Sequence, residues 1–222
     1  MHLDVNNIAC TRTGRPVLDG VTFSVRGGEV LALRGPNGSG KSTLLRILTG
    51  LLPHSAGSAT LCGVDLDRNF DRFTAQVAYS GHLDAIKPQL TVVENLHFWA
   101  ALFGAEDAST AMEAFELGAI SDRPAHACSA GQKRRLGLAR LALTHNRPLW
   151  LLDEPTVSLD TAASAMLFRA VRIHCEAGGA AIIATHIPLD LPRVNEFRLT
   201  PLSEARPRSA MSADPFLEGL LP

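Results

Sequence analysis

A glycine-rich stretch that ends in Lys-Ser-Thr carries the clearest chemistry in the sequence. It runs through Gly35, Pro36, Asn37, Gly38, Ser39, Gly40, Lys41, Ser42 and Thr43. Glycines at these positions let the backbone turn tightly, so that its N–H groups point at an anion. Lys41 would reach the β- and γ-phosphates of a nucleotide, and the hydroxyl of Ser42 would bind Mg²⁺. The pattern predicts a phosphate-binding P-loop, and a purely structural glycine turn is the weaker alternative.

Two consecutive carboxylates, Asp153 and Glu154, follow an apolar run at residues 149–152. Ligands of a parallel sheet bind beyond the carboxyl ends of its strands, so both side chains are expected at the nucleotide. We expect Asp153 to face the Mg²⁺ held by Ser42. Glu154 would orient or deprotonate the water that attacks the γ-phosphate. The alternative is a pair of acidic residues that caps a helix.

A histidine, His186, stands close behind a second apolar run at residues 180–184. This arrangement repeats that of Glu154, because an apolar strand again delivers a polar side chain at its end. His186 would contact the γ-phosphate or the attacking water. A capped or solvated histidine is the alternative. Glu154, His186 and Lys41 are therefore the candidate catalytic residues.

A third polar segment opens a helical pattern at residues 129–143 that is studded with basic side chains. Ser129 and Gly131 stand at the start of this helix, where backbone N–H groups are available to an anion. The chain has one P-loop, so this second helix start that could bind a phosphate is not explained by the P-loop alone.

Apolar runs and helical patterns alternate along the chain, and these elements must position the candidate residues. Strands are expected at residues 3–8, 21–25, 29–33, 59–62, 76–80, 149–152 and 180–184, and helices at residues 43–48, 91–117, 129–143 and 162–175. The first two strands are separated by turn residues, which predicts an antiparallel arrangement. The later strands alternate with helices, which implies a parallel α/β sheet.

The helix expected from residue 91, with a break at Gly104, has two apolar faces. One face includes Leu96 and Ala100, and the other includes Phe98 and Leu102. Our main expectation is that both faces belong to the core. A second apolar face is also what a partner helix would need.

The composition is that of an ordinary globular protein of 222 residues, with 46% hydrophobic residues, 19% charged residues and a formal net charge of −1. The basic excess typical of nucleic-acid binding is lacking, so no nucleic-acid partner is expected. Four widely spaced cysteines predict reduced thiols in the cytosol. Apolar runs all fall short of the roughly 20 residues needed to cross a bilayer, so any membrane association would require a partner.

The order of the motifs resembles that of the ATP-binding cassette (ABC) ATPases. The ordered set comprises the P-loop, a Ser-Ala-Gly-Gln segment from Ser129 (the signature segment), the strand before Asp153, a Ser-Leu-Asp segment that ends at Asp160, and the strand before His186. The resemblance covers residues 1 to about 200. It implies an α/β P-loop NTPase of ABC type, with a mixed core sheet, a flanking antiparallel β subdomain and a helical signature subdomain.

The resemblance also implies how the motifs cooperate. Two copies of an ABC ATPase sandwich two ATP molecules in a head-to-tail dimer, so we expect a homodimer of ATP-binding subunits that uses ATP and Mg²⁺. Ser129, Gly131 and Gln132 of one copy would contact the ATP held by the P-loop of the other. Asp160 would lie in the loop that links the two sites. Ala130 stands where the family usually has glycine, and we expect the contact to survive its extra methyl group.

Two positions depart from the family pattern. The family places a glutamine after the strand at residues 76–80, where it touches Mg²⁺ and senses the membrane partner, and His82 stands there in this sequence. We expect His82 at the nucleotide and the metal, with Gln89 as the alternative. The family also stacks adenine on an aromatic side chain near residues 11–14, which hold none here. Arg12 would stack instead, or nucleotide affinity would be modest.

A narrower resemblance is to the ATP-binding subunits of bacterial cytochrome c maturation, the haem exporter ATPases. It rests on Gly81-His82, on the Glu-Asn-Leu-His-Phe run at residues 94–98, on the signature segment and on the compact length. It implies a peripheral protein on the cytoplasmic face of the bacterial inner membrane, paired with integral membrane subunits of the cytochrome c maturation complex. The subunit would energise haem export or release of the haem-loaded chaperone. His97 is expected to be a packing or surface residue, so no direct haem binding is expected.

Other functions are compatible with some of the motifs. An ABC transporter subunit for another substrate fits all of them, because the membrane subunits choose the substrate. A soluble, non-transport ABC ATPase is disfavoured, because the short distance from His82 to Ser129 leaves no room for a coiled-coil insertion. A small-molecule phosphotransferase would have no use for the signature segment. We expect an ABC ATP-binding domain at residues 1–200 and a loosely ordered, proline-containing tail at residues 201–222.

Overall fold

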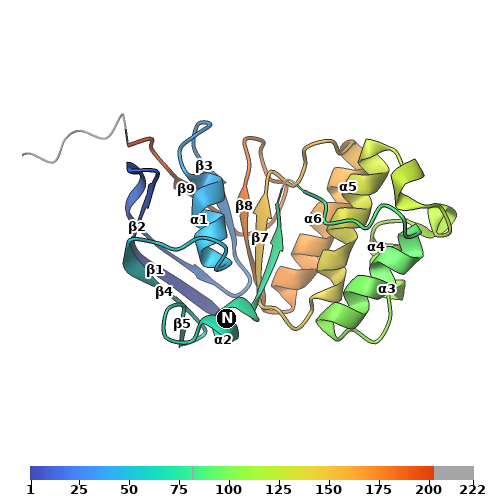
Figure 1. Ribbon diagram of the computed structural model, residues 1–222, viewed down its shortest axis with the longest axis horizontal. Coiled ribbons are helices and arrows are strands. Elements are labelled where there is room, and N and C mark those ends of the chain that lie inside the picture. Colours follow the sequence, from blue (N-terminus) through green and yellow to red (C-terminus); the bar gives the residue numbers. More distant parts are fainter. Residues whose placement is uncertain (82, 203–222) are drawn as a thin grey trace, which may run out of the picture.

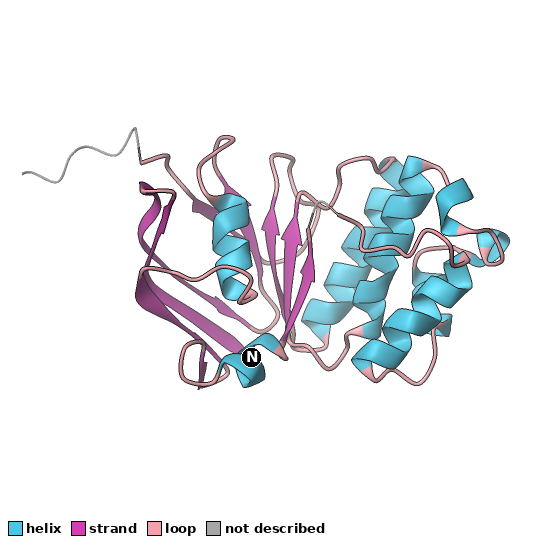
Figure 2. Cartoon of the chain, in the orientation of Figure 1, coloured by secondary structure: helices cyan, strands magenta, loops and turns pink. Residues whose placement is uncertain are grey.

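Two β-sheets enclose α1 (Lys41–Leu48) between them, and the longer helices cover the outer face of the second sheet (Figure 1). The computed structural model describes residues 1–81 and 83–202. Strands and helices occupy separate layers, as the colouring by secondary structure shows (Figure 2). This layering, with a buried P-loop helix, confirms the predicted α/β class.

The first sheet is antiparallel, with strand order β2-β1-β4-β5. Its strands are β1 (His2–Arg12), β2 (Arg15–Arg26), β4 (Ala56–Leu61) and β5 (Val64–Asp65). The second sheet has the order β6-β7-β8-β3-β9 and is parallel throughout its five strands, where the resemblance had implied a mixed sheet. Its strands are β3 (Val30–Arg34), β6 (Val77–Ser80), β7 (Leu149–Asp153), β8 (Ala180–Ala184) and β9 (Val194–Arg198).

Helices occur in the connections between the parallel strands, except in residues 185–193 between β8 and β9. They are α1, α2 (Phe70–Thr74), α3 (Val92–Phe103), α4 (Ser109–Ala114), α5 (Ala130–Ala139) and α6 (Thr161–Glu176), with short 3₁₀ helices η1 (Gly118–Ile120), η2 (Ala125–Ala127) and η3 (Arg140–Leu143). The sequence patterns did not predict α2, β5 and β9. Of the expected tail at residues 201–222, only Pro201 and Leu202 lie within the described residues.

Each buried strand of the parallel sheet contributes to two hydrophobic cores, because its side chains alternate between the two faces. In β7, Leu149 and Leu151 pack with α1 and the antiparallel sheet. Trp150 and Leu152 pack on the opposite face with the helical layer. The carboxyl end of β7 is thereby fixed between two cores, which holds Asp153 in place.

The helix expected from residue 91 ends where the sequence indicated, because Gly104 adopts a left-handed conformation with φ of 70°. Leu96 and Ala100 are buried on its inner face. Phe98 and Leu102 are 38% and 60% exposed, so the main expectation that both faces belong to the core is wrong. α3 therefore presents apolar side chains to the surroundings.

A buried histidine makes the stability of the fold depend on pH. The His174 ring stacks on Trp150 with 4.1 Å between the ring centroids, and burial lowers the His174 pKa from 6.5 to about 4. In the unfolded chain, His174 takes up a proton below pH 6.5, whereas in the folded chain it stays neutral until about pH 4. The stabilising contribution is therefore full above pH 6.5 and is lost as the pH falls through about 4.

We expect His174→Phe, which keeps a ring against Trp150 but cannot titrate, to reduce the acid destabilisation of the fold. The pH-dependent part amounts to at most about 3 kcal/mol in the free energy of unfolding. Urea unfolding at several pH values from 7.5 to about 4.5 measures it, because the wild-type free energy should fall more steeply with pH than that of the variant. Equal slopes would show that His174 does not carry the effect.

Candidate functional site

The predicted P-loop joins β3 to α1. Gly35, Pro36, Asn37, Gly38, Ser39 and Gly40 form the loop, and Lys41, Ser42 and Thr43 begin the helix. Gly40 has a φ of 97°, and a Cβ atom there would lie 2.5 Å from Leu18 Cδ2. Glycine is therefore required at this position for two reasons: the positive φ angle and the close approach of β2. The first N–H groups of α1, which a helix cannot satisfy internally, open onto the loop.

Lys41 is buried, with 7% of its surface exposed, and its ammonium group lies over the loop. Its Nζ donates hydrogen bonds to the carbonyl oxygens of Gly35 at 2.7 Å and Pro36 at 3.2 Å. His186 Nε2 lies 3.3 Å from the same Nζ. The positive charge is thus concentrated beside the loop and the N-terminus of α1, where an anionic ligand is favoured.

A cavity of about 230 Å³ brings the loop together with both acidic residues of β7. Its lining residues are Val17, Asn37, Gly38, Gly40, Lys41, Ser42, Thr43, Asp153 and Glu154. The Ser42 hydroxyl and the Asp153 carboxylate are oxygen donors of the type that Mg²⁺ prefers, and Mg²⁺ is commonly held by one or two carboxylates together with substrate phosphates. The residues present therefore fit the predicted metal.

Glu154 and His186 form a contact that the sequence did not predict. Glu154 Oε1 lies 3.2 Å from His186 Nε2, the same ring nitrogen that lies near Lys41. That nitrogen can accept a hydrogen bond from Lys41 or donate one to Glu154, and the tautomer decides which. The three candidate catalytic residues are thus linked through one imidazole nitrogen. The Glu154 side chain is 17% exposed and that of His186 is 49% exposed. His186 itself lines a neighbouring hollow with Gly35 and Pro36 and is absent from the lining of the 230 Å³ cavity.

The signature residues form a helix cap outside this cavity. Ser129 Oγ accepts a hydrogen bond from the Gln132 backbone N–H, and Gln132 Oε1 accepts one from the Ser129 backbone N–H. Ser129 is exposed at the start of α5, and Gly131 is partly exposed in the first turn. Within the described chain, Ser129, Gly131 and Gln132 are absent from the lining of the P-loop cavity.

Asp160 caps α6 through a hydrogen bond of 2.8 Å that its side chain accepts from the Ala163 backbone N–H. Asp160 is therefore the helix cap in this region, and Asp153 and Glu154 are not. The remaining predicted nucleotide and metal residue, His82, lies outside the described residues. Its neighbour Gly81 is buried.

Two residues of the site region were missed at the sequence level. Val17 lines the cavity next to Gly40, and Arg134 of α5 bonds to the carbonyl oxygen of Glu154. Val17 belongs to a strand that reaches the loop only through tertiary packing. In the sequence, Arg134 is one of several basic residues on a predicted helix. The only signal that could have distinguished it is its spacing of three from Gly137, which places it on the same helix face as a glycine that allows another segment to approach closely.

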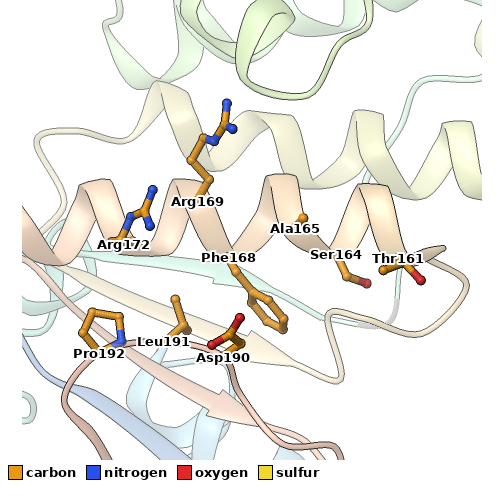
Figure 3. Close-up of a pocket in the computed structure, with 9 residues that line it drawn as sticks. All are labelled: Thr161, Ser164, Ala165, Phe168, Arg169, Arg172, Asp190, Leu191 and Pro192. Atoms are coloured by element: carbon orange, nitrogen blue, oxygen red, sulfur yellow. The ribbon is translucent and has the colours of Figure 1, made fainter.

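A larger hollow of about 670 Å³ lies along α6 and contains none of the predicted site residues. Figure 3 shows Phe168 extending toward the segment of Asp190 and Leu191, whereas Arg169 extends from the other side of the helix. The polar groups of this hollow do not converge on one point. We therefore place the candidate site at the P-loop.

Helices long and apolar enough to span a bilayer were not found among the described residues.

Comparison with known proteins agrees with the motifs. Residues 18–157 match the ABC transporter family. The cytochrome c biogenesis ATP-binding export protein CcmA of Ruegeria pomeroyi is 52% identical over 86% of this chain and 88% of that protein. The CcmA protein of Cereibacter sphaeroides is 48% identical over 96% of both chains.

A solved structure described as the ATP-binding subunit of an ABC transporter superposes with a TM-score of 0.76 and 28% identity. The superposition covers 84% of this chain and 80% of the other. The P-loop, the acidic pair and the signature segment thus occur within a fold that is shared with this family. The chain belongs to the ABC transporter family of ATP-binding, ATP-hydrolysing proteins and, within it, to the cytochrome c biogenesis ATP-binding export proteins CcmA.

Proposed function

We propose that the chain energises a step of bacterial cytochrome c maturation, either haem export or the release of a haem-loaded chaperone. The observation that carries this proposal is the 48% identity over 96% of both chains to a cytochrome c biogenesis ATP-binding export protein. Such similarity extends far beyond the motifs that all ABC ATPases need. An ABC ATPase for an unrelated substrate would need to conserve only the site.

The proposed mechanism starts with ATP in the cavity at the P-loop. The backbone N–H groups of the loop and Lys41 would bind the β- and γ-phosphates. Ser42 and Asp153 would hold Mg²⁺, which neutralises charge on the phosphates when bound. Glu154 would orient the attacking water and take its proton, because it lines the same cavity as the P-loop.

His186 is proposed to respond to the phosphates. Its Nε2 lies 3.3 Å from Lys41 Nζ and 3.2 Å from Glu154 Oε1. When ATP draws Lys41 to its phosphates, the imidazole is released from accepting the lysine hydrogen bond. The half-exposed ring can then change tautomer by giving its Nδ1 proton to solvent and taking one up at Nε2, and the new Nε2–H can donate to the γ-phosphate or the attacking water. This exchange of partners is consistent with the predicted role of His186.

A second copy of the chain would complete the ATP site. Support comes from the signature segment, because the exposed Ser129 and the partly exposed Gly131 stand at a helix start that does not line the cavity of their own chain. A helix start of this kind favours an anion. In the proposed homodimer, Ser129, Gly131 and Gln132 would meet the γ-phosphate held by the partner's P-loop. Asp160 would lie between the two sites, and His82 would approach the nucleotide and Mg²⁺.

Integral membrane subunits are the proposed partners, and the location would be the cytoplasmic face of the inner membrane. The exposed apolar surface of α3 supports this proposal, since Phe98 is 38% and Leu102 is 60% exposed, and Leu83 before the helix is 85% exposed. Apolar side chains at helical spacing suit an amphipathic partner helix. His97 is exposed on the same helix, and no haem is assigned to it. Residues 1–200 would form the ABC domain that moves as the dimer closes.

Complementation of a deletion strain tests the proposed function. We expect deletion to abolish covalently haem-bearing c-type cytochromes, measured by haem staining, and the wild-type chain to restore them. Leu102→Asp should fail to restore them while its isolated subunit keeps wild-type ATPase activity, because a charge is placed on the proposed docking surface. Glu113→Ala, an exchange on the neighbouring α4, is the matched control and should complement fully.

Two results would count against this function. Normal levels of haem-bearing cytochromes in the deletion strain, together with loss of transport of another compound, would assign the chain to another substrate. Full complementation by Leu102→Asp would place the membrane partner elsewhere on the surface.

A further inference from the structure

Arg134 connects three segments around the acidic end of β7. It lies on α5 and is only 5% exposed. Its Nη1 donates to the carbonyl oxygen of Gly81 at 3.0 Å and to Asp84 Oδ1 at 2.8 Å, while its Nη2 donates to the carbonyl oxygen of Glu154 at 3.1 Å. Its Nε donates to the carbonyl oxygen of Pro155 at 3.3 Å. One planar guanidinium therefore joins α5, the signature helix that begins at the signature segment, to the segment after β6 and the turn after β7.

The contact between α5 and the segment after β6 is tight at a second point. A Cβ atom on Gly137 would lie 2.7 Å from Asp84 Cβ and 2.9 Å from its carbonyl oxygen. Only a glycine lets the helix approach so closely. Arg134 and Gly137 are three residues apart and thus face the same segment. The helix and the segment of Asp84 are therefore held together by packing as well as by an ion pair.

Arg134 bonds to the backbone of Glu154, which has an uncommon conformation. Glu154 has a φ of 47°, in the left-handed region that residues other than glycine rarely adopt. Its N–H donates to the carbonyl oxygen of Ala184 at 2.9 Å, and its carbonyl oxygen accepts from Arg134. Hydrogen bonds on both sides of this residue fix the direction in which its side chain leaves the strand. Such strain persists where surrounding contacts determine the backbone.

We propose that Arg134 is a positioning residue for ATP hydrolysis, which sets the backbone of Glu154 and links it to the signature helix and to the segment of Gly81 and Asp84. This inference rests on the proposed role of Glu154 as the group that activates water. Arg134 itself does not line the P-loop cavity. Any shift of α5 on closure of the site would move the Glu154 carbonyl with it, so the carboxylate would be aligned only when the signature helix is in place.

The test compares Arg134→Met and Arg134→Lys with Arg147→Met. Arg147 is a half-buried arginine that also donates to a backbone oxygen, that of Val77, at the opposite end of the sheet. We expect Arg134→Met to lower kcat roughly 10- to 100-fold with KM for ATP almost unchanged, the size expected for a misplacement of about 1 Å. Arg134→Lys keeps the charge but not the planar fork, so its kcat should lie between that of Arg134→Met and that of the wild type. Arg147→Met should leave kcat unchanged.

A double-variant cycle separates positioning from a general loss of structure. In the Glu154→Gln background, Arg134→Met should lower the remaining hydrolysis by no more than about twofold, because the group that Arg134 positions can no longer accept a proton. A full additional loss in that background would overturn the proposal, as would an unchanged kcat in Arg134→Met alone. Normal turnover of Glu154→Gln would instead overturn the role of Glu154. If Arg134→Met does not fold, Arg134→Lys carries the same comparison.

Discussion

The Glu154→Gln variant is expected to bind ATP with wild-type affinity and to hydrolyse it roughly 10²- to 10⁴-fold more slowly, the range for loss of a general base. Glutamine has nearly the shape of glutamate but cannot take a proton from water. The backbone hydrogen bonds of this position, which its N–H donates to Ala184 and its carbonyl oxygen accepts from Arg134, do not involve the side chain and should persist. Phosphate release and binding of a fluorescent ATP analogue measure the two effects separately.

Glu176→Gln provides the matched control for this prediction, because Glu176 is an exposed carboxylate at the end of α6. Its turnover should equal that of the wild type. Normal turnover in Glu154→Gln would exclude Glu154 as the base. A loss of ATP binding in that variant would indicate a role in holding the nucleotide instead.

Lys41→Ala is expected to weaken ATP binding roughly 10- to 100-fold, since hydrogen bonds to charged groups contribute about 1.5–3 kcal/mol. The phosphates lose a positive charge, and the carbonyl oxygens of Gly35 and Pro36 lose the donor that bonds to them. The binding of ADP should weaken less than that of ATP, because ADP lacks the γ-phosphate. Isothermal titration with both nucleotides measures the difference.

The control for this variant is Lys87→Ala, which removes a lysine that lies over the ring of Phe98, away from the P-loop cavity. It should leave both affinities unchanged. Equal ATP affinity in Lys41→Ala and the wild type would contradict the placement of the phosphates at the loop.

Much of the candidate site could be predicted from the sequence because its determinants are local. A P-loop is a run of consecutive residues whose glycines and lysine act through their own backbone turn. Asp153 and Glu154 were identified because a buried strand must end beside the ligand in a parallel sheet. In each case the chemistry follows from neighbours in the chain, and the structure brings these residues to one cavity.

Contacts between distant segments could not be predicted in this way. The interaction of Arg134 with Glu154 joins residues 20 positions apart, and that with Gly81 joins residues 53 positions apart. β9 was missed because an edge strand that is mostly exposed lacks an apolar run, and its register beside β3 is set by the sheet. Burial of His174 against Trp150 likewise depends on how α6 packs.

The role of a second copy in completing the ATP site can be measured directly. Light scattering after size exclusion should show that Glu154→Gln in ATP and Mg²⁺ has twice the mass that it has without nucleotide. Adding Ser129→Arg, which places a bulky side chain at the signature helix start, should return the protein to the mass of one chain. A single-chain mass in Glu154→Gln with saturating ATP, or a dimer that Ser129→Arg does not disturb, would contradict completion of the P-loop site by the partner's signature segment.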